Sequence, residues 1–200
     1  LYADYITNDI NDEATYGQLL SQIAGHRLLL IGPGSSVKKE LDEIRMSIDD
    51  NTLVISVNHI PDGIDVDYLF LSNSKRYVQI ASELVGLDVQ IIATSNVTST
   101  SGGFDFVLNN STLLDFNAEF IDNSLVMLLK ALIKLNVSEA YLAGFDGYSE
   151  NSENFSNPNM EYDFLKGKAS YLNKYTSDFI ASVADRISLH FITHSRYSEV

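Results

Sequence analysis

Seven short runs of β-branched and aliphatic residues, each bounded by turn-forming residues, are the feature that most constrains how this chain folds. Most of the runs are continuously apolar rather than alternating, a pattern typical of strands that are covered on both faces, as in a parallel sheet. The runs are Arg27–Ile31, Thr52–Val57, Tyr68–Leu71, Val89–Ala93, Phe104–Leu108, Ala140–Ala143 and Leu189–Ile192. We therefore expect these runs to be the strands of a mostly parallel sheet.

Segments with helical spacing lie between the apolar runs. Apolar residues recur every three or four positions within residues 37–48, 77–85 and 116–135. Alternation of strands and helices predicts an α/β fold, specifically a Rossmann-like, doubly wound, mostly parallel sheet in a three-layer α/β/α arrangement with right-handed crossovers. Because the sequence contains no internal repeat and no second pattern of elements, we expect one domain spanning residues 1–200.

Two further segments complete the predicted architecture. Residues 1–24 predict a lead-in helix, capped by Asp12 or Thr15, whose apolar face consists of Tyr16, Leu19, Leu20 and Ile23. Residues 149–163 are polar and Asn-rich, and they predict a long loop of the kind that often serves as a lid or binding loop. The chain begins with Leu1 rather than Met. It is therefore either a piece excised from a longer polypeptide or a trimmed chain, and we carry the first interpretation forward.

The composition excludes several classes of function. The chain is 45% hydrophobic and 20% charged, as in globular proteins, and its net charge of −14 would repel the phosphate backbone of nucleic acids. The lack of cysteine excludes disulfides, thiolate metal sites and a cysteine nucleophile, and it fits a reducing cytoplasm. The most apolar stretch, residues 125–135, contains Lys130 and is too short to span a bilayer. We expect a cytoplasmic protein with no nucleic-acid or membrane partner.

The sharpest candidate for a binding site is the turn Gly32-Pro33-Gly34-Ser35-Ser36. It closes a strongly apolar run and precedes a helical segment, so backbone N–H groups and the positive end of the helix dipole would face a ligand. Glycine permits a tight turn, and Ser35 or Ser36 can cap the helix or donate to a phosphate. The turn is neither a G-x-G-x-x-G motif nor a P-loop. It predicts a phosphate or nucleotide site, and an ordinary strand-to-helix cap is the alternative.

Polar residues after the next two runs extend this candidate site. In an open parallel sheet, ligands bind outside the carboxyl ends of the strands, near the point where the strand order reverses. The residues at these ends are Asn58 after the second run and Ser72, Asn73, Lys75 and Arg76 after the third. The basic pair could hold a phosphate or carboxylate, with Arg76 making bidentate contacts. Solvated surface charge is an equally weighted alternative.

Asp146 and Tyr148 follow the sixth run, and His194 follows the seventh. Asp146 could bind a ribose hydroxyl or a metal or act as a general base, and Tyr148 could stack on a base or reach a phosphate. A capping role for Asp146 is an equally weighted alternative. His194 is a second candidate base, although no carboxylate adjoins it in sequence to orient it. The histidines lack the spacing of a zinc site, so we expect no metal.

Three segments resemble a known kind of domain. Residues 28–38 (LLLIGPGSSVK), 54–58 (VISVN) and 67–77 (DYLFLSNSKRY) are similar to the C-terminal domain of aldolase-type proteins encoded with bacterial surface-polysaccharide genes. In those proteins a TIM-barrel domain of the 4-hydroxy-2-oxovalerate aldolase and HMG-CoA lyase type precedes a Rossmann-like domain. The resemblance covers most of residues 1–110. It implies that a barrel in the same chain would be the partner of this domain.

A looser resemblance extends to the second half of the chain. Residues 122–124 (DNS) and 138–148 (SEAYLAGFDGY) are similar to bacterial CMP-sialic-acid-dependent sialyltransferases and to pterin-pyrophosphokinase-like proteins, which bind a nucleotide at the glycine turn. The sialyltransferases carry a catalytic histidine after the corresponding strand. Residues 149–189 of this chain contain no histidine, and this departure argues against sialyl transfer.

Three hypotheses follow from the sequence. The leading one is an accessory C-terminal domain of an aldolase-type lyase that binds a nucleotide, phosphate or sugar phosphate and has no complete active site of its own. A nucleotide is the only cofactor candidate. The second hypothesis is a nucleotide-sugar-dependent transferase that uses Asp146 or His194 as its base. The third is a structural module that forms a homo-oligomer.

Overall fold

Each of the seven apolar runs forms a strand, and the strands pair in one parallel sheet of order β5-β4-β3-β2-β1-β6-β7. The structure is a computed structural model that describes residues 9–99, 103–161 and 163–198. The strands are β1 (Arg27–Ile31), β2 (Thr52–Val57), β3 (Tyr68–Leu71), β4 (Gln90–Thr94), β5 (Phe106–Leu108), β6 (Glu139–Ala143) and β7 (Ser188–Phe191). The predicted Rossmann-like parallel α/β sheet is therefore confirmed. β1, β2 and β3 have the predicted bounds, and the other four strands differ from the predicted runs by one or two residues at their ends.

The fifth strand begins two residues later than predicted, and nearby contacts explain the delay. The carboxylate of Asp105 accepts a hydrogen bond from the backbone N of Ile91 at 2.7 Å, in place of a backbone partner on β5. The ring of Phe104 packs edge-on against Tyr77, with their centroids 5.4 Å apart. Regular pairing between β4 and β5 then starts at Ile92 and Phe106.

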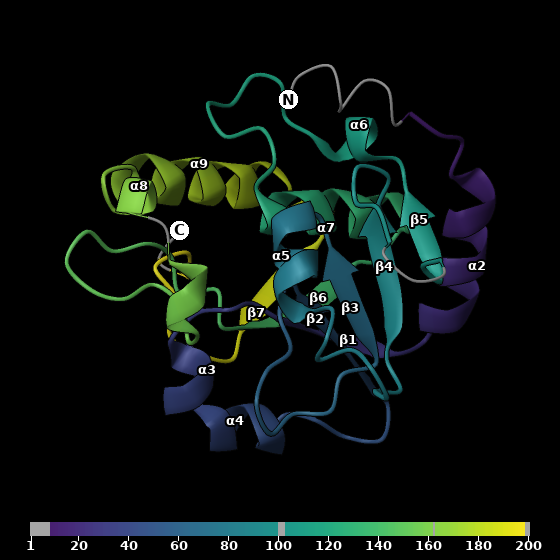
Figure 1. The fold of residues 1–200 in the computed structure, drawn as a ribbon, viewed down its shortest axis with the longest axis horizontal. Helices are drawn as coiled ribbons and strands as arrows, with labels where there is room; N and C mark the ends of the chain where they lie inside the picture. The colour runs from purple at the N-terminus through teal and green to yellow at the C-terminus, as the bar shows by residue number, and fades with distance from the viewer. Residues whose placement is uncertain (1–8, 100–102, 162, 199–200) are drawn as a thin grey trace.

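Consecutive strand residues point to opposite faces of the sheet, and helices bury both sets. Leu28 and Leu30 of β1 pack in a cluster with residues of α2 (Glu13–Ile23) and α7 (Ser124–Lys134). On the opposite face, Leu29 and Ile31 pack with residues of α3 (Ser36–Lys39) and α4 (Leu41–Met46). Further along that face, α5 (Ser74–Ile80) covers β3 and β4. Figure 1 shows the sheet in the middle of the molecule, with α3 and α4 below it.

The first described helix, α2, is shorter than the predicted lead-in helix. It buries Tyr16, Leu19 and Ile23 as expected, whereas Leu20 is 40% exposed and lies off the buried face. Residues 1–8 of the predicted helix lie outside the described residues. Asp12 occupies the N-cap position of α2, but its side chain makes no capping hydrogen bond. The predicted cap is wrong because this carboxylate is used elsewhere.

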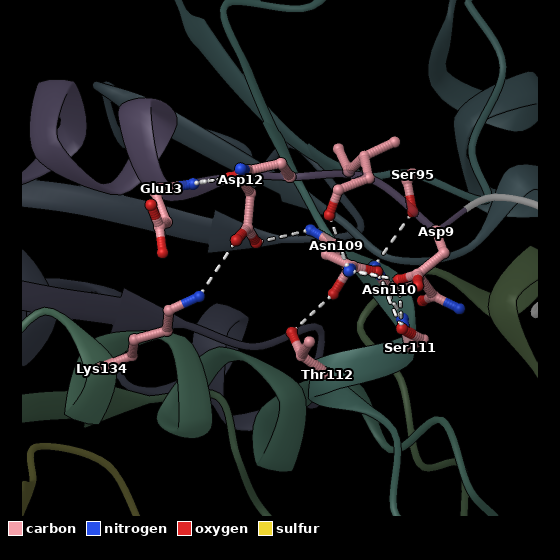
Figure 2. Close-up of polar contacts among 11 residues, drawn as sticks. Asp9, Asp12, Glu13, Ser95, Asn109, Asn110, Ser111, Thr112 and Lys134 are labelled. Carbon is pink, nitrogen blue, oxygen red and sulfur yellow. Dashed lines mark hydrogen bonds and ion pairs between the residues drawn. The ribbon is translucent and has the colours of Figure 1, made fainter.

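The carboxylate of Asp12 joins α2 to two distant parts of the chain. It accepts from the backbone N of Asn109 at 2.8 Å and from Nζ of Lys134 at 3.0 Å, as Figure 2 shows. The ammonium of Lys134 also lies 3.8 Å from the centroid of the Tyr16 ring. The side-chain Nδ2 of Asn109 donates to the carbonyl of Ile10 at 2.8 Å. These contacts fix the start of α2 against the end of β5 and the last turn of α7.

The long helix predicted over 116–135 begins only at Ser124. Asn123 caps α7, since its Oδ1 accepts from the backbone N of Val126 at 3.2 Å. The preceding residues form turns after the short helix α6 (Asn110–Leu113). As a result Phe116 is 48% exposed instead of lying on a buried helical face. None of the helices in the described ranges is long and apolar enough to cross a membrane.

The predicted loop over 149–163 contains a single helical turn, η1 (Pro158–Met160), and leads into α8 (Asp163–Lys166). The next helix, α9 (Ala169–Ser182), was not among the predicted helical segments. It buries only Ala169, Leu172 and Thr176, so its apolar stripe is weak in the sequence.

Candidate functional site

The strand order reverses between β1 and β6, and the candidate site lies at this point. From β1 the chain winds outward through β2 to β5, then returns to place β6 on the other side of β1. Ile31 pairs with Ala143, so the turns that begin at Gly32 and Gly144 leave the sheet side by side. In open α/β sheets the crevice outside such a reversal is where ligands bind.

The two turns at the reversal pack so closely that only glycine fits. The backbone N of Gly34 donates to the carbonyl of Gly144 at 2.8 Å, and the N of Gly32 donates to that of Ala143 at 2.8 Å. A Cβ atom on Gly32 or Gly34 would lie 2.5 or 2.4 Å from the Gly144 carbonyl oxygen. Gly144 itself has a φ of +71° and would place a Cβ atom 2.3 Å from the oxygen of Gly32.

The carboxylate of Asp146 occupies the start of α3. Its Oδ2 accepts from the backbone N of Ser36 at 2.8 Å and from Oγ of Ser35 at 3.3 Å. Oγ of Ser36 donates to the other oxygen, Oδ1. A carboxylate at this position satisfies an unpaired amide and complements the helix dipole. Asp146 therefore has the capping role, one of its two interpretations from the sequence. The sequence also suggested that Ser35 or Ser36 caps α3, but neither serine hydroxyl does so.

A cavity of about 240 Å³ opens beside these turns. Seven of the residues that the sequence analysis singled out line it: Pro33, Gly34, Asn58, Asn73, Arg76, Asp146 and Tyr148. The other candidates are not among the lining residues: Gly32, Ser35, Ser36, Ser72, Lys75 and His194. The cavity therefore brings together residues from the ends of β1, β2, β3 and β6.

Asn58 connects three walls of the cavity. Its backbone has a φ of 57°, in the left-handed region that asparagine tolerates better than most residues. Its Nδ2 donates to Oγ of Ser72 at 3.1 Å and to Oγ of Ser124 at 2.8 Å, while its Oδ1 accepts from the backbone N of Ser72. Ser72 is therefore buried behind Asn58, and Ser124 of α7 completes the wall.

Arg76 is a buried cation in the cavity wall, with an exposed fraction of 6%. Asn73 caps α5 by accepting from the backbone N atoms of Lys75 and Arg76, at 3.0 and 3.2 Å. The Arg76 guanidinium donates to the carbonyl of Met160 at 2.6 Å and lies 5.7 Å from the centroid of the Phe155 ring. Lys75 is exposed and lies outside the cavity lining. The predicted basic pair is therefore divided between the cavity and the surface.

Residues 149–161, which we call the strap, pass over the glycine turn. Phe155 pairs with Gly34 as an antiparallel bridge, and the backbone N of Ser156 donates to the carbonyl of Pro33 at 2.8 Å. Glu161 closes the strap on itself by accepting from the backbone N of Phe155 at 3.2 Å. In Figure 1 this green segment lies beside the start of α3. The polar composition of residues 149–163 marked a loop, but nothing in the sequence indicated its partners.

Aromatic side chains form part of the cavity lining. Phe120 and Phe164 stack with their centroids 6.1 Å apart and their planes 12° apart, and Tyr148 meets Phe155 edge-on at 6.3 Å. Burial raises the pKa of Tyr148, and the nearby Arg76 guanidinium offsets only part of this rise. Burial likewise raises the pKa of Tyr197, whose side chain also lines the cavity. Both tyrosines therefore remain protonated at neutral pH.

Several lining residues were missed in the sequence analysis. They are mainly Phe120, Asn123, Ser124, Phe155, Phe164 and Thr176. The only available signal was the segment Asp122-Asn123-Ser124, in which an asparagine precedes an apolar helix as a cap does. Asn123 also donates to Oγ1 of Thr176 at 3.2 Å and so joins α7 to α9.

The histidines lie away from the cavity lining. His194 is exposed, and its backbone N donates to Glu40 at 3.0 Å. His59 is 5% exposed, and its Nδ1 lies 3.1 Å from the carbonyl oxygen of Val57. Burial lowers the pKa of His59 to about 4, so the ring is neutral at pH 7. Among the described residues, no group of three or more His, Asp or Glu side chains is arranged to hold a metal ion.

Comparison of the chain with protein-family models, with curated proteins and with solved structures finds no match. What the chain shows by itself is a parallel α/β sheet of seven strands, Rossmann-like in its winding, with a cavity at the reversal of strand order.

Proposed function

We propose that this domain binds a small phosphorylated metabolite, a nucleotide or a sugar phosphate, in the cavity between β1 and β6. The observation that carries the proposal is the position of the cavity, because open α/β sheets bind ligands where the strand order reverses. Its volume of about 240 Å³ lies somewhat below the range typical of ligand pockets, roughly 300–1,000 Å³, so it suits a small ligand.

The distribution of charge favours one side of the cavity for the anionic part of such a ligand. Among the described lining residues Arg76 is the only Lys, Arg or His, and it lies beside Asn73. The start of α3, where the sequence placed the phosphate, already holds the Asp146 carboxylate. The phosphate of a ligand would therefore lie near Arg76 instead of at the glycine turn.

The contacts of the candidate bases support a binding role over the transferase alternative. The carboxylate of Asp146 already accepts hydrogen bonds from Ser35 and Ser36, and His194 lies on the exposed surface outside the cavity lining. The resemblance to aldolase-associated domains supports an accessory role, in the cytoplasm and beside an aldolase-type barrel of the same chain. We also propose that the protein assembles into homo-oligomers.

Isothermal titration calorimetry with CMP, CDP, ATP and glucose 6-phosphate tests the proposal. We expect at least one of these ligands to bind. Arg76→Gln should weaken that binding roughly tenfold, because it removes a charge-assisted contact. Lys75→Gln is the matched control, since it removes the neighbouring exposed charge, and it should leave the affinity within about twofold. Thermal unfolding of both variants checks that they fold. Neither heat nor a melting shift with any of the four ligands would contradict the proposal.

A further inference from the structure

The cavity wall contains more negative than positive charge. Among the described lining residues, Asp146 and Asp122 carry negative charge and Arg76 alone carries positive charge. An ionised carboxylate accepts hydrogen bonds and cannot donate them, so a ligand group that meets Asp146 must be a donor. Phosphate oxygens are negatively charged acceptors at neutral pH, and a carboxylate repels them.

Asp146 has room for one further donor. A carboxylate offers about four acceptor positions. The structure fills three of them, with the backbone N and Oγ of Ser36 and with Oγ of Ser35. Within the described residues, Oδ1 receives the Ser36 hydroxyl alone, and Asp146 lines the cavity. A ligand hydroxyl is a donor that would fit this acceptor position.

The other polar lining groups both donate and accept. Among the described lining residues, Ser124, Thr176 and Tyr197 carry hydroxyls and Asn73 carries an amide, whereas the amide of Asn58 is already used by Ser72 and Ser124. A sugar hydroxyl can both donate and accept, so it can bond to a donor or to an acceptor in the lining. A phosphate oxygen can only accept, so it can bond to the donors alone. The polar lining therefore matches a polyhydroxylated ligand better than a polyphosphate.

The aromatic side chains fit the remaining surface of such a ligand. Phe120, Phe155 and Phe164 line the cavity, and the ring centroids of Phe120 and Phe164 are 6.1 Å apart in a stacked arrangement. The apolar face of a sugar ring can pack against such rings, and so can a nucleobase. Charge then separates the two ligand classes, because a nucleoside diphosphate or triphosphate brings more negative charge toward the Asp146 carboxylate than a ligand with one anionic group does.

We infer that the ligand of this cavity is a sugar with a single anionic group, such as a sugar acid or a sugar monophosphate, whose hydroxyls donate to Asp146 while its anionic group faces Arg76. This inference rests on the proposed function, whose cavity it uses. It excludes nucleoside diphosphates and triphosphates, and it admits a carboxylate in place of the phosphate as the anionic group of the ligand.

Calorimetry with four probes tests the inference on the wild-type protein. The probes are glucuronate, glucose 6-phosphate, ATP and inorganic phosphate, which separate the sugar from the anion. We expect glucuronate or glucose 6-phosphate to bind at least about tenfold more tightly than ATP and phosphate, because only the sugars supply donors to Asp146. If ATP binds as tightly as the better sugar, the inference is overturned while the proposed function stands. If none of the four binds, the inference is overturned, and the proposed function then stands only if CMP or CDP binds.

Asp146→Asn provides the second arm. The asparagine oxygen can still accept from the Ser36 backbone N, and thermal unfolding confirms that the variant folds. We expect it to weaken sugar binding by about tenfold and to leave ATP binding unchanged or stronger, because one acceptor and one negative charge are lost. Asp185→Asn makes the same change of charge at an exposed position outside the cavity, and it should alter neither affinity. Equal losses for sugar and ATP in Asp146→Asn would overturn the inference.

Discussion

Replacing Gly144 with alanine is expected to lower the free energy of unfolding by about 4 kcal/mol, from backbone strain and steric overlap together. The backbone at Gly144 has a φ of +71°, which an alanine adopts only with strain. The added Cβ atom would lie 2.3 Å from the carbonyl oxygen of Gly32 and 2.4 Å from a methyl carbon of Val37. Relief of these overlaps requires the turns after β1 and β6 to separate, which also breaks the hydrogen bond from Gly34 to Gly144.

Gly17→Ala is the matched control for this substitution. Gly17 lies within α2, and a Cβ atom built on it meets nothing within 4 Å. Alanine is the better helix former, so this variant should be more stable than the wild type by up to about 1 kcal/mol. Urea denaturation of the three proteins measures both effects. An unchanged urea midpoint for Gly144→Ala would show that the two turns are not packed as described.

His59→Asn is expected to remove a large part of the pH dependence of stability. Burial lowers the pKa of His59 from 6.5 to about 4, so the unfolded chain binds a proton in this interval while the folded protein does not. The folded state therefore loses stability as the pH falls from the unfolded pKa toward the folded one. This single group should cost about 2 kcal/mol between about pH 7 and about pH 5.

Asparagine is chosen because its amide can replace the contact between Nδ1 of His59 and the carbonyl of Val57, 3.1 Å apart in the structure. Within the described residues, Nε2 of His59 has no hydrogen-bond partner, so the substitution breaks no bond there. The exposed His194→Asn serves as the control and should follow the wild-type curve. Urea denaturation at several pH values measures the slopes. Parallel wild-type and His59→Asn curves would mean that His59 is not buried in its neutral form.

The sheet could be predicted from sequence because its physical requirement is local. A parallel strand covered on both faces must be apolar at nearly every position, and runs such as Leu28–Ile31 and Leu69–Leu71 meet this requirement without reference to the rest of the chain. The helices were predicted less well. The apolar pattern over 116–135 did not mark Asn123 as the cap at which α7 begins, and α9 buries too few apolar side chains to show a clear stripe.

The site could be predicted only as a set of strand ends. The rule that ligands bind at carboxyl ends placed the glycine turn, Asn58, Arg76 and Asp146 at one edge of the sheet, which the structure confirms as their common location. It could not show that Asp146 fills the start of α3, since that contact joins residues 110 positions apart and depends on the register between β1 and β6. The contacts of the strap with Pro33 and Gly34 are non-local in the same way.

Ligand binding in the cavity between β1 and β6 can be located by amide chemical shifts. In a titration of the ¹⁵N-labelled protein with glucose 6-phosphate, we expect the largest shifts at the backbone amides of Gly34, Arg76 and Asp146, which line the cavity. Shifts confined to the opposite edge of the sheet, at Arg27 and Tyr141 for example, with none at the three cavity residues, would contradict the account.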